Sequence, residues 1–234
     1  WGRGDVVKLL LKHGADVNKG SIRRGITPLV MASSWGRIDV VKLLLQHRAK
    51  VDKATTDHGT TPLYAASNCR NINVVKLLLQ NGADVNRGDD EGETPLFSAC
   101  QKGYIDVMQL LLENGADPNK QDEEGTTPLM IAIESHNDKI ALELGKLLTS
   151  FGADIHYVDE DREDVFDIAR RDDKTETLAW LESVSDFTPI QICAASGCPA
   201  GLRALVHHRE LDPFAQGPDT PSLIELAGGK SPAL

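Results

Sequence analysis

The sequence predicts an all-α repeat solenoid, in which helix-turn-helix units of about 33 residues stack side by side. Two recurring tripeptides carry this prediction. Thr-Pro-Leu begins at Thr27, Thr61, Thr94 and Thr127, in steps of 34, 33 and 33 residues. Gly-Ala-Asp begins at Gly14, Gly82, Gly115 and Gly152. Because one such unit cannot bury its apolar face alone, successive units must cover one another.

The first helix of a unit is best seen after Thr94. The Thr94 hydroxyl can accept a hydrogen bond from a free backbone N–H at the helix start, and Pro95 fits the first helical position. Leu96, Ala99 and Cys100 then follow at i, i+3 and i+4 and give the helix one face of mostly small residues. We expect this short helix to form the inner layer of the array.

A second, more apolar helix follows at residues 105–112. It has too many apolar residues for a single buried stripe, so it should pack on two neighbours. Gly115 supplies the left-handed residue that ends such a helix. The polar segment at residues 119–125 is long enough for a β-hairpin finger between units.

These motifs resemble the ankyrin repeat family, strongly over residues 1–154 and more weakly over residues 157–227. The resemblance implies inner and outer helices joined by β-hairpin fingers. It also implies that a protein partner is held by the finger tips and by the exposed face of the inner helices.

The repeats divide the chain into three parts. Residues 1–183 form the main array, with a truncated first repeat, four full repeats and a cap-like repeat in which Asp164 replaces the threonine. Residues 184–227 hold degenerate repeats, and residues 228–234 form a frayed tail. The Thr-Pro pattern restarts at Thr188, too soon after Asp164 to leave room for a finger. We favour continuation of one irregular array over a second short array near residue 184.

Three positions depart from the pattern. Arg48 stands where sister units have a glycine at the end of the second helix, and Arg70 and His136 stand where glycine separates the two helices. Four extra residues after His136 predict a longer second helix at residues 138–150. In the cap-like repeat, we expect a short second helix at about residues 175–182.

Charge and composition limit the function. The 234 residues carry a net charge of −10, and this charge is uneven. Residues 1–60 have 11 Lys and Arg against 5 Asp and Glu, whereas residues 89–186 have 8 against 25. A polyanion would be repelled by most of the chain, so we expect no nucleic-acid partner. The asymmetry indicates an interaction surface, although an acidic face that only aids solubility is an open alternative.

Other features predict the setting of the chain. No apolar run reaches the roughly 18 residues of a membrane helix, so we expect no membrane partner. The four cysteines show no paired framework, which predicts a reducing compartment, cytoplasmic or nuclear. Because Trp1 already lies inside a repeat, we expect a monomeric fragment of a longer chain.

No residue pattern indicates catalysis. The seven histidines are scattered, without His-Glu-x-x-His or zinc-finger spacing, and no glycine-rich phosphate loop is present. We therefore expect no enzyme activity, no cofactor and no metal.

The candidate site consists of the finger tips and the exposed positions of the inner helices, counted from each Thr-Pro-Leu. These partner-binding candidates are Arg23, Arg24, Ile26, Ser34, Trp35, Asp57, His58, Asn68, Cys69, Asp90, Glu91, Glu93, Gln101, Lys102, Glu123, Glu124, Glu134 and Ser135. Trp35, and Trp1 one unit earlier, are the strongest anchors, because Trp is enriched at binding hot spots. The alternative for Trp35 is packing on a neighbouring repeat. Val30, Tyr64, Phe97 and Met130 occupy the slot where the family usually has His, and we expect them to be partly buried.

The sequence thus predicts a protein-protein interaction scaffold without enzyme activity. Two alternatives stay open. The chain could be the recognition arm of a larger enzyme, such as a ubiquitin-ligase substrate receptor or an ankyrin-containing kinase, or a structural spacer in a long array.

Overall fold

The computed structural model describes residues 4–187, 189–198 and 201, which fall into two compact units. Unit 1 comprises residues 1–116 and 121–123, and unit 2 comprises residues 117–120 and 124–234. The helices of unit 1 are α1 (Gly4–Lys12), α2 (Pro28–Ser34), α3 (Ile38–Gln46), α4 (Pro62–Asn68), α5 (Ile72–Gln80), α6 (Pro95–Lys102) and α7 (Ile105–Glu113). Those of unit 2 are α8 (Pro128–Glu134), α9 (Asp138–Ser150), α10 (Val165–Arg171), α11 (Thr175–Val184) and α12 (Pro189–Ala195). Within the described ranges, no helix is long and apolar enough to cross a membrane.

The Thr-Pro-Leu threonines start equivalent helices, as predicted. The hydroxyl oxygen of each threonine accepts a hydrogen bond from the backbone N–H three residues later, at 3.2 Å for Thr27, 3.1 Å for Thr61, 3.1 Å for Thr94 and 3.2 Å for Thr127. Proline takes the first helical position in every case. The cap satisfies a donor that the helix itself cannot satisfy.

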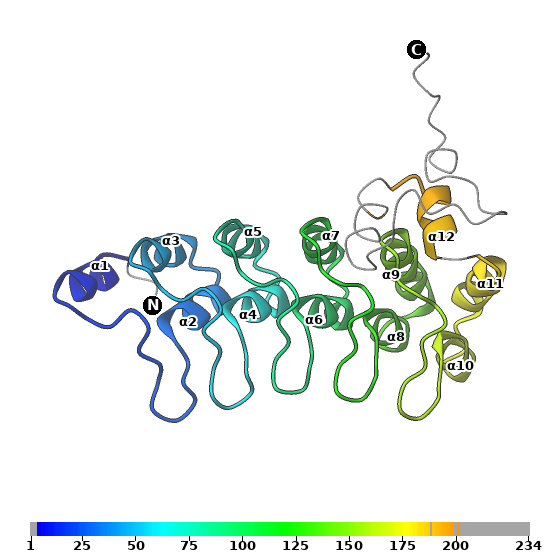
Figure 1. The fold of residues 1–234 in the computed structure, drawn as a ribbon, viewed down its shortest axis with the longest axis horizontal. Coiled ribbons are helices and arrows are strands. Elements are labelled where there is room, and N and C mark those ends of the chain that lie inside the picture. Colours follow the sequence, from blue (N-terminus) through cyan, green and yellow to red (C-terminus); the bar gives the residue numbers. More distant parts are fainter. Residues whose placement is uncertain (1–3, 188, 199–200, 202–234) are drawn as a thin grey trace, which may run out of the picture. The chain divides into compact units, whose positions relative to one another are not determined.

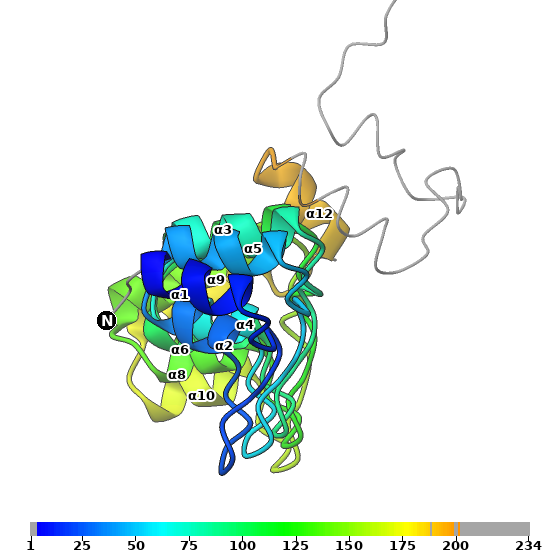
Figure 2. The same ribbon diagram turned by 90° about the vertical axis from the view of Figure 1, so that its left-hand side faces the viewer.

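Unit 1 has two layers of helices (Figure 1). The inner helices α2, α4 and α6 lie side by side, and the outer helices α1, α3, α5 and α7 form a second row (Figure 2). Leu29, Leu63 and Leu96, the leucines of the motif, are fully buried in the inner layer. Each inner helix also packs on the outer helix that follows it in sequence. The core of unit 1 is therefore a continuous apolar seam between the two rows.

Left-handed residues end the helices, and two of these residues are arginines. Gly103 ends α6 at φ 68°, but Arg70 stands in the equivalent place with φ 53°. Arg70 is held by Asp106, whose carboxylate lies 3.2 Å from Nε, and by the ring of Tyr104 at 5.5 Å. Arg48, at φ 62°, replaces the glycine that closes an outer helix. At Gly82, its counterpart, a Cβ would meet nothing within 4 Å, so Arg48 fits sterically and bears only backbone strain.

The predicted β-hairpin fingers are not confirmed. The loops between an outer helix and the next inner helix, here called finger loops, contain no strand within the described residues. Backbone bonds cross these loops, such as Thr55 N–H to Thr60 O at 3.0 Å. In the loops before α2, α4, α6 and α10, a polar side chain at the base also accepts from the loop backbone, as Asp89 does from Glu91 and Glu93 at 3.1 and 3.0 Å. These loops are thus ordered by backbone and side-chain bonds together, without strands in the described residues.

Unit 2 contains the longer helix and the cap-like repeat. Helix α9 spans Asp138–Ser150, as the spacing after His136 predicted. Asp164 caps α10 by accepting from Phe166 and Asp167, at 2.8 and 3.0 Å. Helix α11 runs two residues beyond the predicted end and stops at Val184, so no finger loop separates it from α12.

Helix α12 departs from the regular repeat. It packs on the outer helix α9, and the Cys193 thiol lies 3.3 Å from the carbonyl of Thr149. The expected helix at residues 202–206, the Thr220-Pro221 unit and the tail at residues 228–234 lie outside the described residues. The boundaries at residues 183 and 227 stay predictions.

Candidate partner-binding surface

The tips of the finger loops in unit 1 are joined to one another. We call Arg23, Arg24, Asp57, His58, Asp90, Glu91 and Glu123 the finger-tip row. One backbone bond links each tip to the next: Thr56 N–H to Arg24 O at 2.9 Å, Asp90 N–H to His58 O at 3.1 Å and Glu123 N–H to Glu91 O at 2.9 Å. The loops extend from the helical layers in the same direction (Figure 2). The structure therefore brings these seven predicted residues into one ordered line.

The charge of the finger-tip row changes along its length. Arg23 and Arg24 open it, Asp57 and His58 follow, and Asp90, Glu91 and Glu123 close it. Arg24 pairs with Asp57 at 3.6 Å, but the Arg24 side chain is exposed and such pairs are weak. All seven residues are exposed, although the Asp57 side chain itself is only 25% exposed beside Arg24. Both the basic and the acidic end are therefore open to a partner.

Glu93 is less available than the tips. It is half-buried, and the Tyr64 hydroxyl donates to its Oε2 at 2.6 Å. Burial raises the pKa of Tyr64, and the bond to Glu93 raises it further. Burial also raises the pKa of Glu93, with Asp89 and Glu91 adding to the effect and the Tyr64 bond opposing it. This pair ties α4 to the third finger loop.

Tyr64 occupies the slot that the family usually fills with His. It is partly buried, as predicted, whereas Val30, Phe97 and Met130 in the same slot are fully buried. The expectation of partial burial is wrong for these three, because each packs between adjacent helices without a polar end to keep near water.

The inner-helix candidates are placed at the ends of α2, α4 and α6. Ser34 lies 3.7 Å from the sulfur of Cys69, and Asn68 accepts from the Ser98 hydroxyl at 3.1 Å. Ser34, Asn68 and Gln101 are half-buried, while Cys69 and Lys102 are exposed. Ile26 is half-buried at the base of the first finger loop. Ser34 and Asn68, two of its half-buried members, join neighbouring repeats within unit 1.

Trp35, directly after α2, is the large apolar residue of this set that stays exposed. Its side chain is 66% exposed, and its Nε1–H donates to the sulfur of Met31 at 3.1 Å. This exposure favours an accessible Trp35 over the alternative that it packs against a neighbouring repeat. Trp1 lies outside the described residues.

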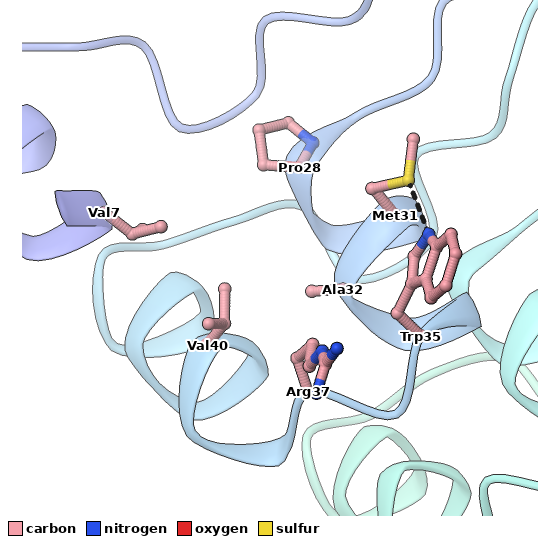
Figure 3. Close-up of a pocket in the computed structure, with 7 residues that line it drawn as sticks. All are labelled: Val7, Pro28, Met31, Ala32, Trp35, Arg37 and Val40. Carbon is pink, nitrogen blue, oxygen red and sulfur yellow. Dashed lines mark hydrogen bonds between the residues drawn. The ribbon is translucent and has the colours of Figure 1, made fainter. Parts of the chain in front are cut away.

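Trp35 borders an apolar hollow of about 420 Å³ (Figure 3). The hollow lies between α1 and α2. Its lining consists of Val7, Pro28, Met31, Ala32, Trp35, Arg37 and Val40. Sequence reasoning selected only Trp35 from this set, because the hollow depends on how helices of different repeats are placed in space.

Three candidates belong to unit 2. Glu124 and Ser135 are exposed, and Glu134 is bound to Arg171 at 2.8 Å. Arg171 also pairs with Glu163. Glu160, at the tip of the finger loop before α10, donates its backbone N–H to Glu124 O at 3.1 Å. Sequence reasoning missed this tip, although counting back from Asp164 as from each threonine would have found it.

The described residues contain no group of three or more His, Cys, Asp or Glu that could hold a metal ion. Burial raises the pKa of the Cys100 thiol, so this thiol stays protonated at neutral pH and is a poor nucleophile. The candidate surface presents exposed charges and the exposed aromatic side chain of Trp35, which suit recognition of another macromolecule.

Stacked helix pairs with projecting, linked loops define a helical repeat protein. A family model of ankyrin repeats, in three copies, matches residues 1–89 and again residues 86–159. The chain therefore belongs to the ankyrin repeat family, as its motifs predicted. Repeats of this family generally mediate protein-protein interaction and typically have no enzyme activity. A search of curated proteins found no match to the chain.

Proposed function

We propose that this chain is a non-enzymatic protein-binding module whose partner lies along the finger-tip row and the exposed ends of the inner helices. The observation that carries the proposal is the chain of backbone bonds that joins successive tips. Because the tips are ordered before binding, their side chains lose little entropy when a partner is held. The partner is a protein segment with an acidic patch for Arg23 and Arg24, and a basic patch for Glu91, Glu123 and Glu124.

We place this interaction in the cytosol or the nucleus. The support is the chemistry of the cysteines: the structure shows no disulfide among the four, at positions 69, 100, 193 and 198. Cysteines outside disulfides are ordinary in reducing compartments. We also propose that the chain binds its partner as a monomer and has no nucleic-acid ligand, in keeping with its acidic charge.

Affinity purification of the full chain, followed by quantitative mass spectrometry, tests the proposal. The test variant reverses the basic end (Arg23→Glu with Arg24→Glu). The matched control reverses two exposed lysines on outer helices, Lys42→Glu with Lys76→Glu, which changes the net charge by the same amount. A partner that uses the row is lost from the test variant and kept by the control. Equal recovery with both variants would contradict the proposed surface, and recovery of no partner by the unchanged chain would favour the structural spacer.

The rate of association gives the second readout. Charge reversal at a binding surface mainly slows association, and salt screens the effect. With the recovered partner, we expect the Arg23 and Arg24 reversal to slow association several-fold at low salt and much less at high salt. A change confined to dissociation would contradict electrostatic guidance by the basic end.

A further inference from the structure

The turn that closes α3 departs twice from the turns that close the other outer helices. Residues 48–50 are Arg-Ala-Lys, whereas the sister turns have Gly-Ala-Asp, at residues 14–16, 82–84, 115–117 and 152–154. Arg48 has φ 62°, a backbone conformation that glycine adopts without strain and other residues do not. Both exchanges add positive charge to the same turn.

The exchange at Lys50 also removes a hydrogen bond. In the sister turns, the aspartate accepts a bond from the backbone two residues later, as Asp84 does from the Asn86 N–H at 3.0 Å. The lysine side chain has no acceptor, so Lys50 cannot make this bond. The turn therefore keeps two residues that weaken it locally. Backbone strain of this kind is concentrated at functional sites, so we examined what surrounds the turn.

The turn borders an open hollow of about 570 Å³. Two neighbouring loops of unit 1 line this hollow, with Lys50, Val51, Asp52, Lys53, Ala54 and Arg87. The Nζ of Lys53 donates to the carbonyl oxygen of Asn18 at 2.7 Å, which positions the amine without neutralising its charge. The Oδ1 of Asp52 accepts from the Asp84 N–H at 3.1 Å. The hollow is thus built from side chains whose places are partly fixed by hydrogen bonds.

Positive charge exceeds negative charge around the hollow. Its lining includes the three cations Lys50, Lys53 and Arg87 but the single carboxylate of Asp52. All three cations are exposed, and Arg48 adds a fourth in the same turn. In the part of the chain that the structure describes, none of these four cations is in an ion pair. We call Arg48, Lys50, Lys53 and Arg87 the basic loop surface.

We propose that the basic loop surface binds a phosphorylated side chain of a partner protein, with the phosphate group in the hollow. The lining has two more positive than negative charges, which matches the charge of about −1.5 to −2 on a phosphoserine at pH 7. A phosphate also has three strong acceptor oxygens, one for each cation that lines the hollow. A carboxylate has a single charge and two oxygens, so it matches the hollow less well.

This inference goes beyond the proposed function, because the basic loop surface shares no residue with the finger-tip row. The reversal of Arg23 and Arg24 tests the row, whereas variants of residues 48–53 test the hollow. Failure of one of the two surfaces therefore leaves the other standing.

A small phosphorylated compound serves as the probe. N-acetyl-O-phosphoserine amide is titrated into the isotopically labelled full chain, and the backbone amides are followed by nuclear magnetic resonance. N-acetylglutamate amide and N-acetylserine amide are titrated in the same way. We expect saturable shifts with the phosphoserine compound, confined to the amides of residues 48–53, Arg87 and their neighbours. The glutamate compound should bind at least about 5-fold more weakly, and the serine compound should cause no saturable shift.

The principal variant restores the sister turn through Arg48→Gly with Lys50→Asp. It should fold at least as well as the unchanged chain, because it removes the strain and returns the acceptor, and circular dichroism verifies this. We expect it to weaken binding of the phosphoserine compound at least about 10-fold. The matched control, Lys42→Glu with Lys76→Gln on the outer helices, changes the net charge by the same amount. It should alter binding less than about two-fold, because salt screens distant exposed charges.

Two single variants test the hollow itself. Arg87→Gln removes the cation that the next loop contributes and should weaken binding about 3-fold or more. Asp52→Asn removes the carboxylate but keeps an oxygen that can accept from the Asp84 N–H, and Asn18 and Asn86 occupy the same position in sister turns. This variant should therefore strengthen binding, by about 2-fold or more.

Absence of saturable shifts at residues 48–53 would overturn the proposal, as would equal binding of the phosphoserine and glutamate compounds. Equal losses in the restored turn and its matched control would also overturn it, because net charge alone would then explain binding. Vesicles that contain a phosphorylated inositol lipid and a ten-nucleotide single-stranded DNA are the last two probes. Saturable binding of either one that the restored turn abolishes would overturn the assignment to a protein partner.

Discussion

Helices α1 and α3 share the sequence Asp-Val-Val-Lys-Leu-Leu-Leu, at residues 5–11 and 39–45, but they do not share their burial. Val40 and Leu44 are buried in α3, while Val6 and Leu10 are about half exposed in α1. Helix α3 is covered by α2, its own inner helix, and α1 has no such cover among the described residues. In a repeat array, burial is a property of the neighbours of a residue.

The largest expected effect tests this comparison directly. Leu44→Ala should lower the free energy of unfolding by about 2–5 kcal/mol, because it removes a fully buried side chain and leaves a cavity. Leu10→Ala, the same change at the equivalent position, should cost less than about 1 kcal/mol. Urea unfolding followed by circular dichroism measures both. Similar losses in the two variants would show that Leu10 is buried in solution and would break the comparison.

The repeat period predicted what is local to a unit. The caps at Thr27 and Thr94 follow from residues within four positions of each other, and the length of α9 follows from counting residues between His136 and Gly152. These features can be predicted without knowing how the repeats stack on one another. For the same reason, the period could assign the chain to inner and outer helices and to the ankyrin family.

Contacts between neighbouring repeats could not be predicted from the repeat period. Tyr64 binds Glu93, 29 residues away, and the hollow beside Trp35 depends on how α1 and α2 are placed. The β-hairpin fingers were expected from loop length, but the backbone bonds of a tip go partly to the next tip, as from Thr56 to Arg24. The period placed Arg23, Asp57, Asp90 and Glu123 in the finger loops, where the structure has them, while their exposure could only be judged from the structure. Partner binding at these residues stays a prediction.

Two left-handed glycines extend the comparison to the turns. Gly36 and Gly82 have φ values of 63° and 80°, so alanine is strained at either place. A Cβ on Gly36 would also lie 2.5 Å from Oδ1 of Asn71, whose Nδ2 donates to the carbonyls of Ser33 and Ser34 at 2.9 and 2.8 Å. Displacing this amide would break both hydrogen bonds, which join two neighbouring repeats of unit 1.

We therefore expect Gly36→Ala to destabilise the chain by about 2–3 kcal/mol and Gly82→Ala, which meets no atom within 4 Å, by about 1 kcal/mol. Urea unfolding provides the measurement for both. As a control, Gly36→Ala combined with Asn71→Ala should lose less than the sum of the two single changes, because the clash is then absent. Equal costs at the two glycines would show that Asn71 moves aside freely.

The smallest effect concerns the two arginines that replace such glycines. Arg48 has backbone strain, and no ion pair within the described part of the chain offsets it. Arg48→Gly should therefore stabilise the chain by about 0.5–1 kcal/mol, after the greater freedom of glycine in the unfolded state is subtracted. Arg70→Gly relieves similar strain, but it removes the ion pair with Asp106 and the contact with Tyr104. Each of these is worth less than about 1 kcal/mol at an exposed site, so the net change should be near zero.

High salt distinguishes the two arginines further, because it weakens the Arg70 ion pair. In 1 M salt, Arg70→Gly should therefore raise the free energy of unfolding more than it does at low salt, while the effect of Arg48→Gly should not change. Equal gains for both variants at low salt would mean that the partners of Arg70 contribute nothing, and that strain alone decides which residue a turn accepts.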